Sequence, residues 1–274
     1  MQQLAYVNGE FHPAREARVP ALDAGMQFGA GLFETLLAAW GRPHLLGRHL
    51  GRLRASCTAL GLPCPLDDER AARVIAELLE RGGLTEMEAR VKIIVTPGDL
   101  AQHYTHRDPT VVVTAEPYVR PPQHIPWSLM APRETLASPI AGHKSTSYFA
   151  YRLLLHRARA EGFDDAVLLD RDGHVSETTI ASLLLFEDGR MIRPASPDVL
   201  RGITAEVIEE SARGLGMEVV HRAVAADELT AGAAVCVCNS LLGIAAVQRI
   251  GAQRIAPLAD AALAELRAAW RALP

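Results

Sequence analysis

Residues 141–148 read AGHKSTSY and place a lysine, Lys144, among small and polar residues just before a helix predicted over 147–161. Of the 28 basic residues in the chain, 26 are arginine, and the two lysines are Lys92 and Lys144. A guanidinium stays protonated, whereas an amine can lose its proton and attack a carbonyl to form a Schiff base. A coding bias towards arginine would also explain why lysine is rare, and Lys144 could be an ordinary lysine in an exposed loop. Other parts of the sequence are therefore needed to choose between these interpretations.

The composition indicates a soluble globular protein that can form two domains. Of its 274 residues, 49% are hydrophobic and 22% are charged. A net charge of −4 gives no electrostatic reason to expect nucleic acid or an anionic membrane as a partner. No apolar run approaches the roughly 18 residues of a spanning helix, and the start of the sequence lacks the pattern of a signal peptide. We therefore expect a cytoplasmic protein without a membrane or nucleic-acid partner.

The four cysteines give no sign of a disulfide framework or of a metal site. Cys57, Cys64, Cys236 and Cys238 are too few and too poorly spaced for either. Cys236 and Cys238 alternate within AAVCVCNS, which is typical of one face of a buried strand. We expect them to serve packing, and we predict no metal.

The first half of the chain predicts a mixture of strands and helices. Asn8-Gly9 lies between apolar runs and predicts a type I′ hairpin. Leucines three and four residues apart predict a helix over about 46–60, and a second helix is predicted over 68–81. Strands are expected at 90–96 and 110–116. Lys92 alternates with apolar neighbours in the first of these strands, which indicates a solvent-facing position.

Residues 117–126, PYVRPPQHIP, hold four prolines in ten positions and are the predicted linker. The linker divides the chain into a smaller N-terminal α/β domain, 1–116, and a larger C-terminal domain, 127–274. Strands and helices are mixed in both, without the regular alternation of a doubly wound sheet. Beyond the helix at 147–161, the expected elements are a strand at 165–170, an apolar stretch at 175–186, a helix from LRGIT (200–204) to about 214, strands near 217–224, 233–239 and 244–250, a helical turn at 227–229, and a helix at 260–272.

Three further places suit a cofactor that carries a phosphate and an aldehyde. In LRGIT, a glycine precedes the helix, so the backbone N–H groups of Ile203 and Thr204 could bind an anion that approaches closely. Glu177 could keep a pyridine nitrogen protonated, which makes the ring an electron sink. Arg52 lies among leucines on the first long helix. Each has an ordinary alternative, because many helices follow a glycine, loop glutamates are often exposed, and an arginine stem can cover apolar surface.

Taken in order, the motifs of the chain resemble those of the fold type IV pyridoxal-phosphate enzymes. This family includes branched-chain aminotransferase, D-amino-acid aminotransferase and aminodeoxychorismate lyase. The resemblance implies a two-domain α/β fold of the D-amino-acid aminotransferase type, pyridoxal 5′-phosphate as cofactor, a small-molecule amino substrate and a homodimer. The motifs are LDAGMQFGAGLFET (22–35), HLGRL (49–53), RVKIIVTPG (90–98), HKSTSY (143–148), GHVSET (173–178), LRGIT (200–204) and NSLLG (239–243).

The resemblance also assigns roles to individual residues. Lys144 matches the catalytic lysine that forms the Schiff base and then moves the Cα proton, and Glu177 matches the glutamate at the pyridine nitrogen. The phosphate would be bound by the residues that match its ligands in the family, which are Arg52, the backbone of Ile203 and Thr204, and Ser240. Tyr148 matches a tyrosine near the ring hydroxyl. The chain departs from the family at Ala30, where an acid is common, and at Ser182, where an asparagine is usual.

The subfamily signals favour 4-amino-4-deoxychorismate lyase. NSLLG, FET (33–35) and SET (176–178) look like the lyase branch, whereas branched-chain enzymes typically carry a Gly-Thr pair near the phosphate. A transaminase of branched-chain or D-amino acids remains the alternative, and a non-catalytic pyridoxal-phosphate-binding protein remains a third. Candidate substrate-side groups are Phe33, Arg90 and Arg107, together with His143, although surface or structural roles would also explain them.

Overall fold

The computed structural model describes residues 3–101, 105–122 and 124–273, with the side chains of residues 100–107 outside the described part. By its contacts, the chain divides into two compact units. The first contains the chain up to Arg120 together with His143–Tyr148, and the second contains Pro121–Gly142 and Phe149–Leu273. Lys144 therefore belongs to the first unit, although it follows the proline-rich segment in the sequence.

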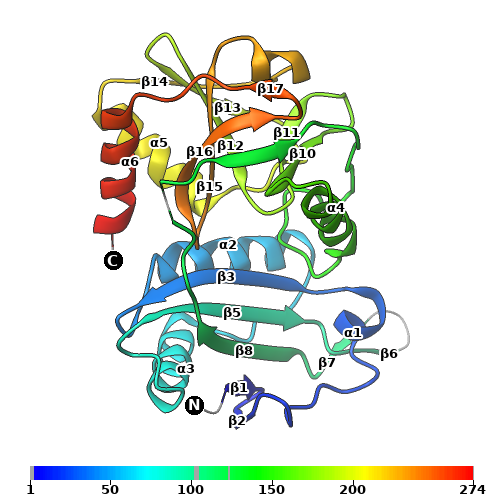
Figure 1. The fold of residues 1–274 in the computed structure, drawn as a ribbon. Coiled ribbons are helices and arrows are strands. Elements are labelled where there is room, and N and C mark those ends of the chain that lie inside the picture. The colour runs from blue at the N-terminus through cyan, green and yellow to red at the C-terminus, as the bar shows by residue number, and fades with distance from the viewer. Residues whose placement is uncertain (1–2, 102–104, 123, 274) are drawn as a thin grey trace. The chain divides into compact units, whose positions relative to one another are not determined.

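The first unit is built on a six-stranded sheet in the order β2-β1-β8-β5-β3-β4, in which all neighbouring strands are antiparallel (Figure 1). The hairpin predicted at Asn8-Gly9 is confirmed, since both residues have positive φ, 49° and 122°, and Val7 pairs with Glu10. The strands are β1 (Leu4–Val7), β2 (Glu10–Pro13), β3 (Leu32–Ala39), β4 (Arg42–Pro43), β5 (Glu88–Thr96) and β8 (Thr110–Pro117).

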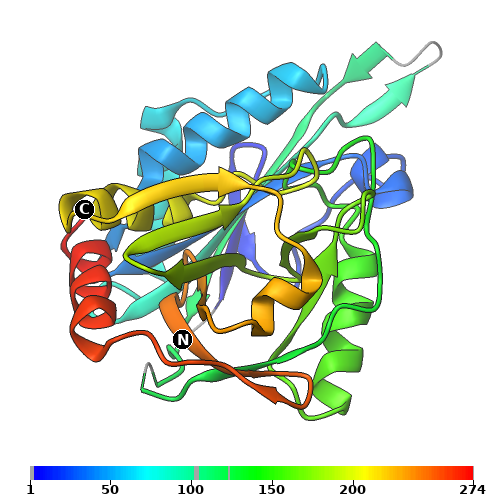
Figure 2. The same cartoon turned by 90° about the horizontal axis from the view of Figure 1, so that it is seen from above.

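Two helices, α2 (Leu46–Ala59) and α3 (Asp68–Arg81), pack against this sheet and confirm the predicted ranges. Helix α3 begins after Asp67, whose side chain accepts a hydrogen bond of 2.7 Å from the N–H of Arg70. The short helix α1 (Ala24–Phe28) and the strand pair β6 (Asp99–Ala101) and β7 (Thr105–Arg107) complete the unit. Figure 2 shows this pair extending beyond the end of the sheet.

The second unit is built on a mixed nine-stranded sheet in the order β11-β10-β9-β16-β15-β12-β13-β14, with β17 paired to β16. Strand β9 runs parallel to both of its neighbours, and β13 runs parallel to β14. The strands are β9 (Trp127–Met130), β10 (Asp165–Leu169), β11 (Val175–Thr178), β12 (Ser182–Glu187), β13 (Arg190–Pro194), β14 (Glu218–Arg222), β15 (Ala234–Asn239), β16 (Gly243–Ile250) and β17 (Gln253–Arg254).

Helices cover this second sheet. Helix α4 (Phe149–Ala160) packs on β10, whereas α5 (Ile203–Gly214) and α6 (Asp260–Ala272) pack on each other (Figure 1). A 3₁₀ turn, η2, covers Ala226–Thr230. The predicted α/β architecture is confirmed. Among the described residues, none of the helices is both long and apolar enough to cross a membrane.

Candidate active site

The segment His143–Tyr148 is held against the beginning of β3 by backbone hydrogen bonds. The N–H of Phe33 donates to the carbonyl of Lys144 at 2.8 Å, and the N–H of Thr146 donates to the carbonyl of Gly31 at 2.8 Å. Gly31 allows this approach, since a Cβ there would lie 3.0 Å from Thr146 Oγ1. The motifs FGAGLFET and HKSTSY therefore form one local structure, which fixes the backbone of the lysine.

The Lys144 ammonium lies over two aromatic rings. Its Nζ is 4.6 Å from the centroid of Phe33 and 5.7 Å from that of Tyr148, and the two rings meet edge to face. Two residues named from the sequence, Phe33 and Tyr148, thus lie in the immediate surroundings of the amine. Phe33 is only 7% exposed, so the ring lies largely beneath the surface.

Lys92 is the second cation at the same ring. Phe33 lies opposite Ile94 in the pairing of β3 with β5, so Lys92, two residues earlier, projects from the same face as Ile94. Its Nζ lies 4.7 Å from the centroid of Phe33, and the residue is half-buried. Lys92 keeps partial exposure to solvent and also contacts Phe33, which the sequence did not predict, because apolar alternation on one strand does not show what the neighbouring strand places beside it.

Glu34, His49 and Arg52 form a buried charged cluster that the sequence pattern did not reveal. Arg52 donates from Nε to Glu34 Oε1 at 2.8 Å and from Nη2 to Oε2 at 2.6 Å, and His49 Nδ1 lies 2.7 Å from Oε2. Glu34 is 1% exposed and His49 is fully buried. The sequence signal that could have indicated this cluster was the place of its residues inside the motifs FET and HLGRL.

Opposing effects set the pKa values in this cluster. Burial alone would raise the pKa of Glu34, but the charge of Arg52 and the hydrogen bonds from His49 and Arg52 outweigh burial and hold it at about 2. Burial lowers the pKa of His49, and the charges of Arg52 and Lys144 act in the same direction. The cluster is therefore an ionised carboxylate with a neutral imidazole. The phosphate-binding role of Arg52 stays a prediction.

Glu177 lies in β11, a strand whose four residues are all buried, and is itself 9% exposed. The turn after it is fixed by Asp165, which accepts hydrogen bonds from the backbone N–H groups of Thr179 at 3.2 Å and Ile180 at 3.3 Å. Burial raises the pKa of Asp165. Burial also raises the pKa of Tyr151 to about 12, and the nearby Glu177 carboxylate adds to this rise. Asp165 and Tyr151 are thus neighbours of the Glu177 region that the sequence did not indicate.

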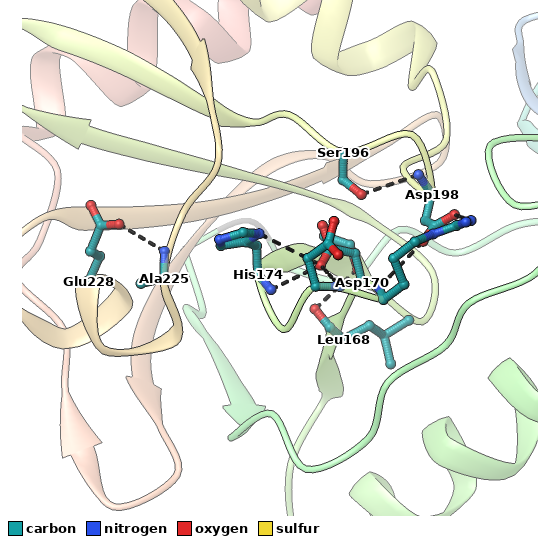
Figure 3. Close-up of polar contacts among 10 residues, drawn as sticks. Leu168, Asp170, His174, Ser196, Asp198, Ala225 and Glu228 are labelled. Atoms are coloured by element: carbon teal, nitrogen blue, oxygen red, sulfur yellow. Dashed lines mark hydrogen bonds and ion pairs between the residues drawn. The ribbon is translucent and has the colours of Figure 1, made fainter.

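The turn before β11 is fixed in a similar way (Figure 3). Asp170 Oδ1 accepts hydrogen bonds of 2.9 Å from the backbone N–H groups of Asp172 and His174. Arg171 donates from Nη2 to Asp198 at 2.7 Å. The strand that carries Glu177 is therefore anchored at both ends by buried carboxylates that bind backbone donors.

The start of helix α5 brings several predicted phosphate ligands together. Ile203 and Thr204 are its first two residues, and the N-cap residue, Gly202, makes no side-chain cap hydrogen bond. A Cβ at Gly202 would lie 2.5 Å from Ser182 Oγ, so the glycine is required where Ser182 packs. Thr204 Oγ1 lies 3.5 Å from Ser240 Oγ. Within the second unit, the structure thus places Ser240 beside the helix N-terminus.

The motif NSLLG forms the turn that presents Ser240. The side-chain oxygen of Asn239 accepts hydrogen bonds from the N–H groups of Leu241 at 3.0 Å and Leu242 at 2.8 Å, and its Nδ2 donates to Ile180. Gly243, with φ of 76°, ends the turn against Trp270, which a Cβ would meet at 2.9 Å.

The remaining substrate-side candidates have different surroundings. Arg90 is exposed and pairs with Glu116, which lies directly opposite it across β5 and β8. Arg107 ends β7, and its side chain lies outside the described part. His143 Nδ1 lies 3.0 Å from Ser56 Oγ on α2, so the residue before Lys144 is tied to that helix.

A protein-family model described as amino-transferase class IV matches residues 31–250. The chain belongs to the class IV aminotransferase family. It is 30% identical over 239 residues to a putative branched-chain-amino-acid aminotransferase of Methanocaldococcus jannaschii, covering 82% of each chain. It is 27% identical over 226 residues to the aminodeoxychorismate lyase of Bacillus subtilis, covering 78% of this chain and 75% of that one.

Solved structures of the family share its fold. A branched-chain aminotransferase of Thermoproteus uzoniensis superposes with a TM-score of 0.89 at 20% identity, covering 99% of this chain and 94% of that one. The family's enzymes are transaminases and lyases that use pyridoxal 5′-phosphate, and a second branched-chain amino acid aminotransferase, with a TM-score of 0.83, is described with pyridoxamine 5′-phosphate. The residues present suit this cofactor, since the chain offers a fixed amine, a buried carboxylate and a glycine cradle that a Cβ would fill.

Proposed function

We propose that this class IV aminotransferase-family enzyme is a 4-amino-4-deoxychorismate lyase, which releases pyruvate and leaves 4-aminobenzoate. The observation that carries the proposal is the pair of ammonium groups at one ring, Lys144 at 4.6 Å and Lys92 at 4.7 Å from the centroid of Phe33. Aminodeoxychorismate bears two carboxylates, and a second cation beside the reacting amine complements the second one. A branched-chain side chain is apolar and would not complement a nearby cation, whose desolvation is costly.

Each residue has a defined task in this proposal. Lys144 supplies the amine that holds the cofactor and then moves the proton at the substrate carbon that bears the amino group. The amine is kept oriented by the hydrogen bond from the N–H of Phe33 to the carbonyl of Lys144 and by the rings of Phe33 and Tyr148. Bound pyridoxal 5′-phosphate supplies the electron sink for the bond changes at that carbon.

The resemblance to the family supports the assignments of the phosphate and ring-nitrogen contacts. We assign the phosphate to the backbone N–H groups of Ile203 and Thr204 and to the hydroxyl of Ser240, which lie together at the start of α5. We assign Glu177 to the pyridine nitrogen, where a buried carboxylate keeps the nitrogen protonated.

A branched-chain transaminase is the second candidate. It is supported by the 30% identity to the putative branched-chain aminotransferase of M. jannaschii. In that case the amino donor would be glutamate, and Lys92 would bind its second carboxylate. The branched side chain of the other substrate would lie elsewhere.

One paired assay separates the two candidates. The full chain, loaded with pyridoxal phosphate, is supplied with aminodeoxychorismate, and pyruvate is followed through lactate dehydrogenase. In parallel it is supplied with L-leucine and 2-oxoglutarate, and glutamate is followed. We expect pyruvate and 4-aminobenzoate in equal amounts and little glutamate. Pyruvate no higher than that released by Lys144→Ala would exclude the lyase, and rapid glutamate formation would establish the transaminase.

We also propose a homodimer. Four exposed apolar side chains lie within one short stretch of the first unit, where solvent exposure is unfavourable. Light scattering on the purified protein should give twice the chain mass, and Phe28→Asp should lower it. The four are Val19, Leu22, Met26 and Phe28.

A further inference from the structure

Cys57 and Cys64 lie in contact in the first unit, one at the end of α2 and the other in the loop that follows. Both are free thiols, and a hydrogen bond joins their side chains. Cys57 is 2% exposed and belongs to the core of the unit, whereas Cys64 is half-buried and packs against that core from the outside. Cys64 is therefore the more exposed of the two residues.

The chain reversal at the end of α2 accounts for this contact. The N–H of Leu62 donates to the carbonyl of Cys57 at 2.8 Å, and the N–H of Gly61 donates to that of Thr58 at 3.3 Å. Gly61 has φ of 65°, so the helix ends in a Schellman motif that turns the chain back on itself. The return of the loop towards Cys57 is thus encoded in the backbone.

Two prolines then restrict the returning loop. Pro63 and Pro65 flank Cys64, and each fixes its own φ and limits the residue before it. The unfolded chain loses less entropy when such a loop is ordered. The sequence GLPCP therefore holds the Cys64 sulfur next to Cys57 at little conformational cost.

The electrostatics make the outer sulfur the reactive one. The hydrogen bond from Cys57 lowers the pKa of Cys64 to about 6, and the charge of Arg54 acts in the same direction. The same hydrogen bond raises the pKa of Cys57. A lower pKa raises the fraction of Cys64 that is thiolate, and the thiolate is the form that attacks an oxidant.

The other two cysteines are an internal control. Cys236 and Cys238 are buried in β15, at 0% and 1% exposure, as the alternating pattern predicted. Burial raises the pKa of each to about 12, so both are neutral thiols without access to solvent.

We infer that Cys57 and Cys64 form a peroxide-reactive site that closes to a reversible disulfide. The Cys64 thiolate attacks one oxygen of hydrogen peroxide, the O–O bond breaks, and the hydroxide that leaves takes up a proton to become water. The Cys57 sulfur then attacks the resulting sulfenic acid, the S–O bond breaks, and a second water leaves with the Cys57 proton. Two thiols are oxidised, and one peroxide is reduced to two waters.

The site is coupled to the lysine through the residue beside Cys57, a consequence that rests on the proposed function. Ser56 contacts His143 at 3.0 Å, and His143 precedes Lys144. Closing the disulfide shortens the sulfur–sulfur contact to about 2.05 Å, so the last turn of α2 or the loop has to shift. Oxidation should therefore lower turnover.

The disulfide can be tested without cofactor or substrate. Both thiols lie in one tryptic peptide, Ala55–Arg70, and the control pair lies in another, Ala223–Arg249. The reduced full-length protein is treated with one equivalent of hydrogen peroxide at pH 7, alkylated and digested. We expect the first peptide to become two hydrogen atoms lighter and to recover after dithiothreitol, while the second keeps both thiols. Equal oxidation of the two peptides, or two alkylated thiols in the first, would overturn the inference.

Single variants separate the two steps. In Cys57→Ser, the sulfenic acid at Cys64 should persist and be trapped by dimedone, whereas Cys64→Ser should give neither product. Trapping at Cys57 in Cys64→Ser would contradict the assigned order. Turnover should fall several-fold on oxidation of the wild type and stay constant in Cys64→Ser. A disulfide that forms without changing turnover would exclude the coupling, and an enzyme inactive in both states would point instead to a wrong proposed function.

Discussion

The two units hold their functional groups by different means. In the first, the groups depend on contacts between residues far apart in the sequence, as where the Arg52 side chain on α2 binds Glu34 on β3 and where the backbone of residues 143–148 bonds to the start of β3. In the second, the helix start Gly202–Thr204 and the turn at Asn239 are formed mainly by neighbours in the sequence, with long-range support such as the contact of Gly202 with Ser182. A substitution in the first unit should therefore act at a distance, whereas one in the second should act locally.

The largest effect should come from the amine itself. Lys144→Ala should lower turnover on the order of 1,000-fold, because both the nucleophile and the proton carrier are lost. Lys144→Arg keeps the positive charge over Phe33 and should be equally inactive. The measurement is turnover of the loaded enzyme, with thermal unfolding as the check that both variants fold. Substantial turnover in Lys144→Arg would show that charge, and not the amine, is what the site needs.

Removal of the buried carboxylate should act on the whole first unit. Glu34→Gln leaves Arg52 and His49 without their ionised partner and should lower the free energy of unfolding by about 3 kcal/mol. Urea unfolding measures this loss. Glu69→Gln is the matched control, since Glu69 forms an exposed pair with Arg73 and its loss should change little.

The same carboxylate should make stability depend on pH in a defined direction. The pKa of Glu34 is about 2 in the folded chain and 4.5 ordinarily, so its contribution is present above pH 4.5 and is lost as the pH falls towards 2. Wild type should lose more stability than Glu34→Gln over this interval in urea unfolding at several pH values. Parallel curves would mean that the cluster does not hold the carboxylate ionised.

Lys92 should decide between substrates. Lys92→Met should raise KM for aminodeoxychorismate about tenfold, equal to about 1.4 kcal/mol, with little change in kcat, because a carboxylate loses its partner. Lys92→Arg should retain most of the affinity. Steady-state kinetics measure KM and kcat for both variants. An unchanged KM in Lys92→Met would contradict the role of Lys92 on which the lyase proposal rests.

The smallest effect should be the local one. Gly202→Ala places a Cβ against Ser182. The steric crowding should weaken pyridoxal phosphate binding about fivefold, which is a loss of about 1 kcal/mol of binding free energy. Ser182→Ala in the same chain removes the clashing oxygen and should restore most of the affinity. A titration of the cofactor followed by absorbance measures each variant. Failure of the second substitution to rescue the first would show that the strain lies elsewhere.

What the sequence could predict depends on how local each structural signal is. Helices α2, α3 and α6 were found to within one residue at each end, because apolar spacing and end residues are local signals. The apolar stretch at 175–186 is in fact two strands, separated at Thr179–Ala181. That break depends on Asp165, fourteen residues away, which binds the turn. The contact of Lys92 with Phe33 and the cluster around Glu34 could not be predicted from the sequence either, because strand register and helix packing create them.

The place of residues 143–148 bears on how such a chain can be divided or inherited. Six residues of the first compact unit are encoded within the stretch that otherwise forms the second. A gene fragment ending at Arg120 would therefore supply the sheet, the helices and the charged cluster, but not the lysine. The two units cannot be exchanged by a single crossover between related genes without separating the amine from its strand. Recombination should thus preserve this chain as one piece.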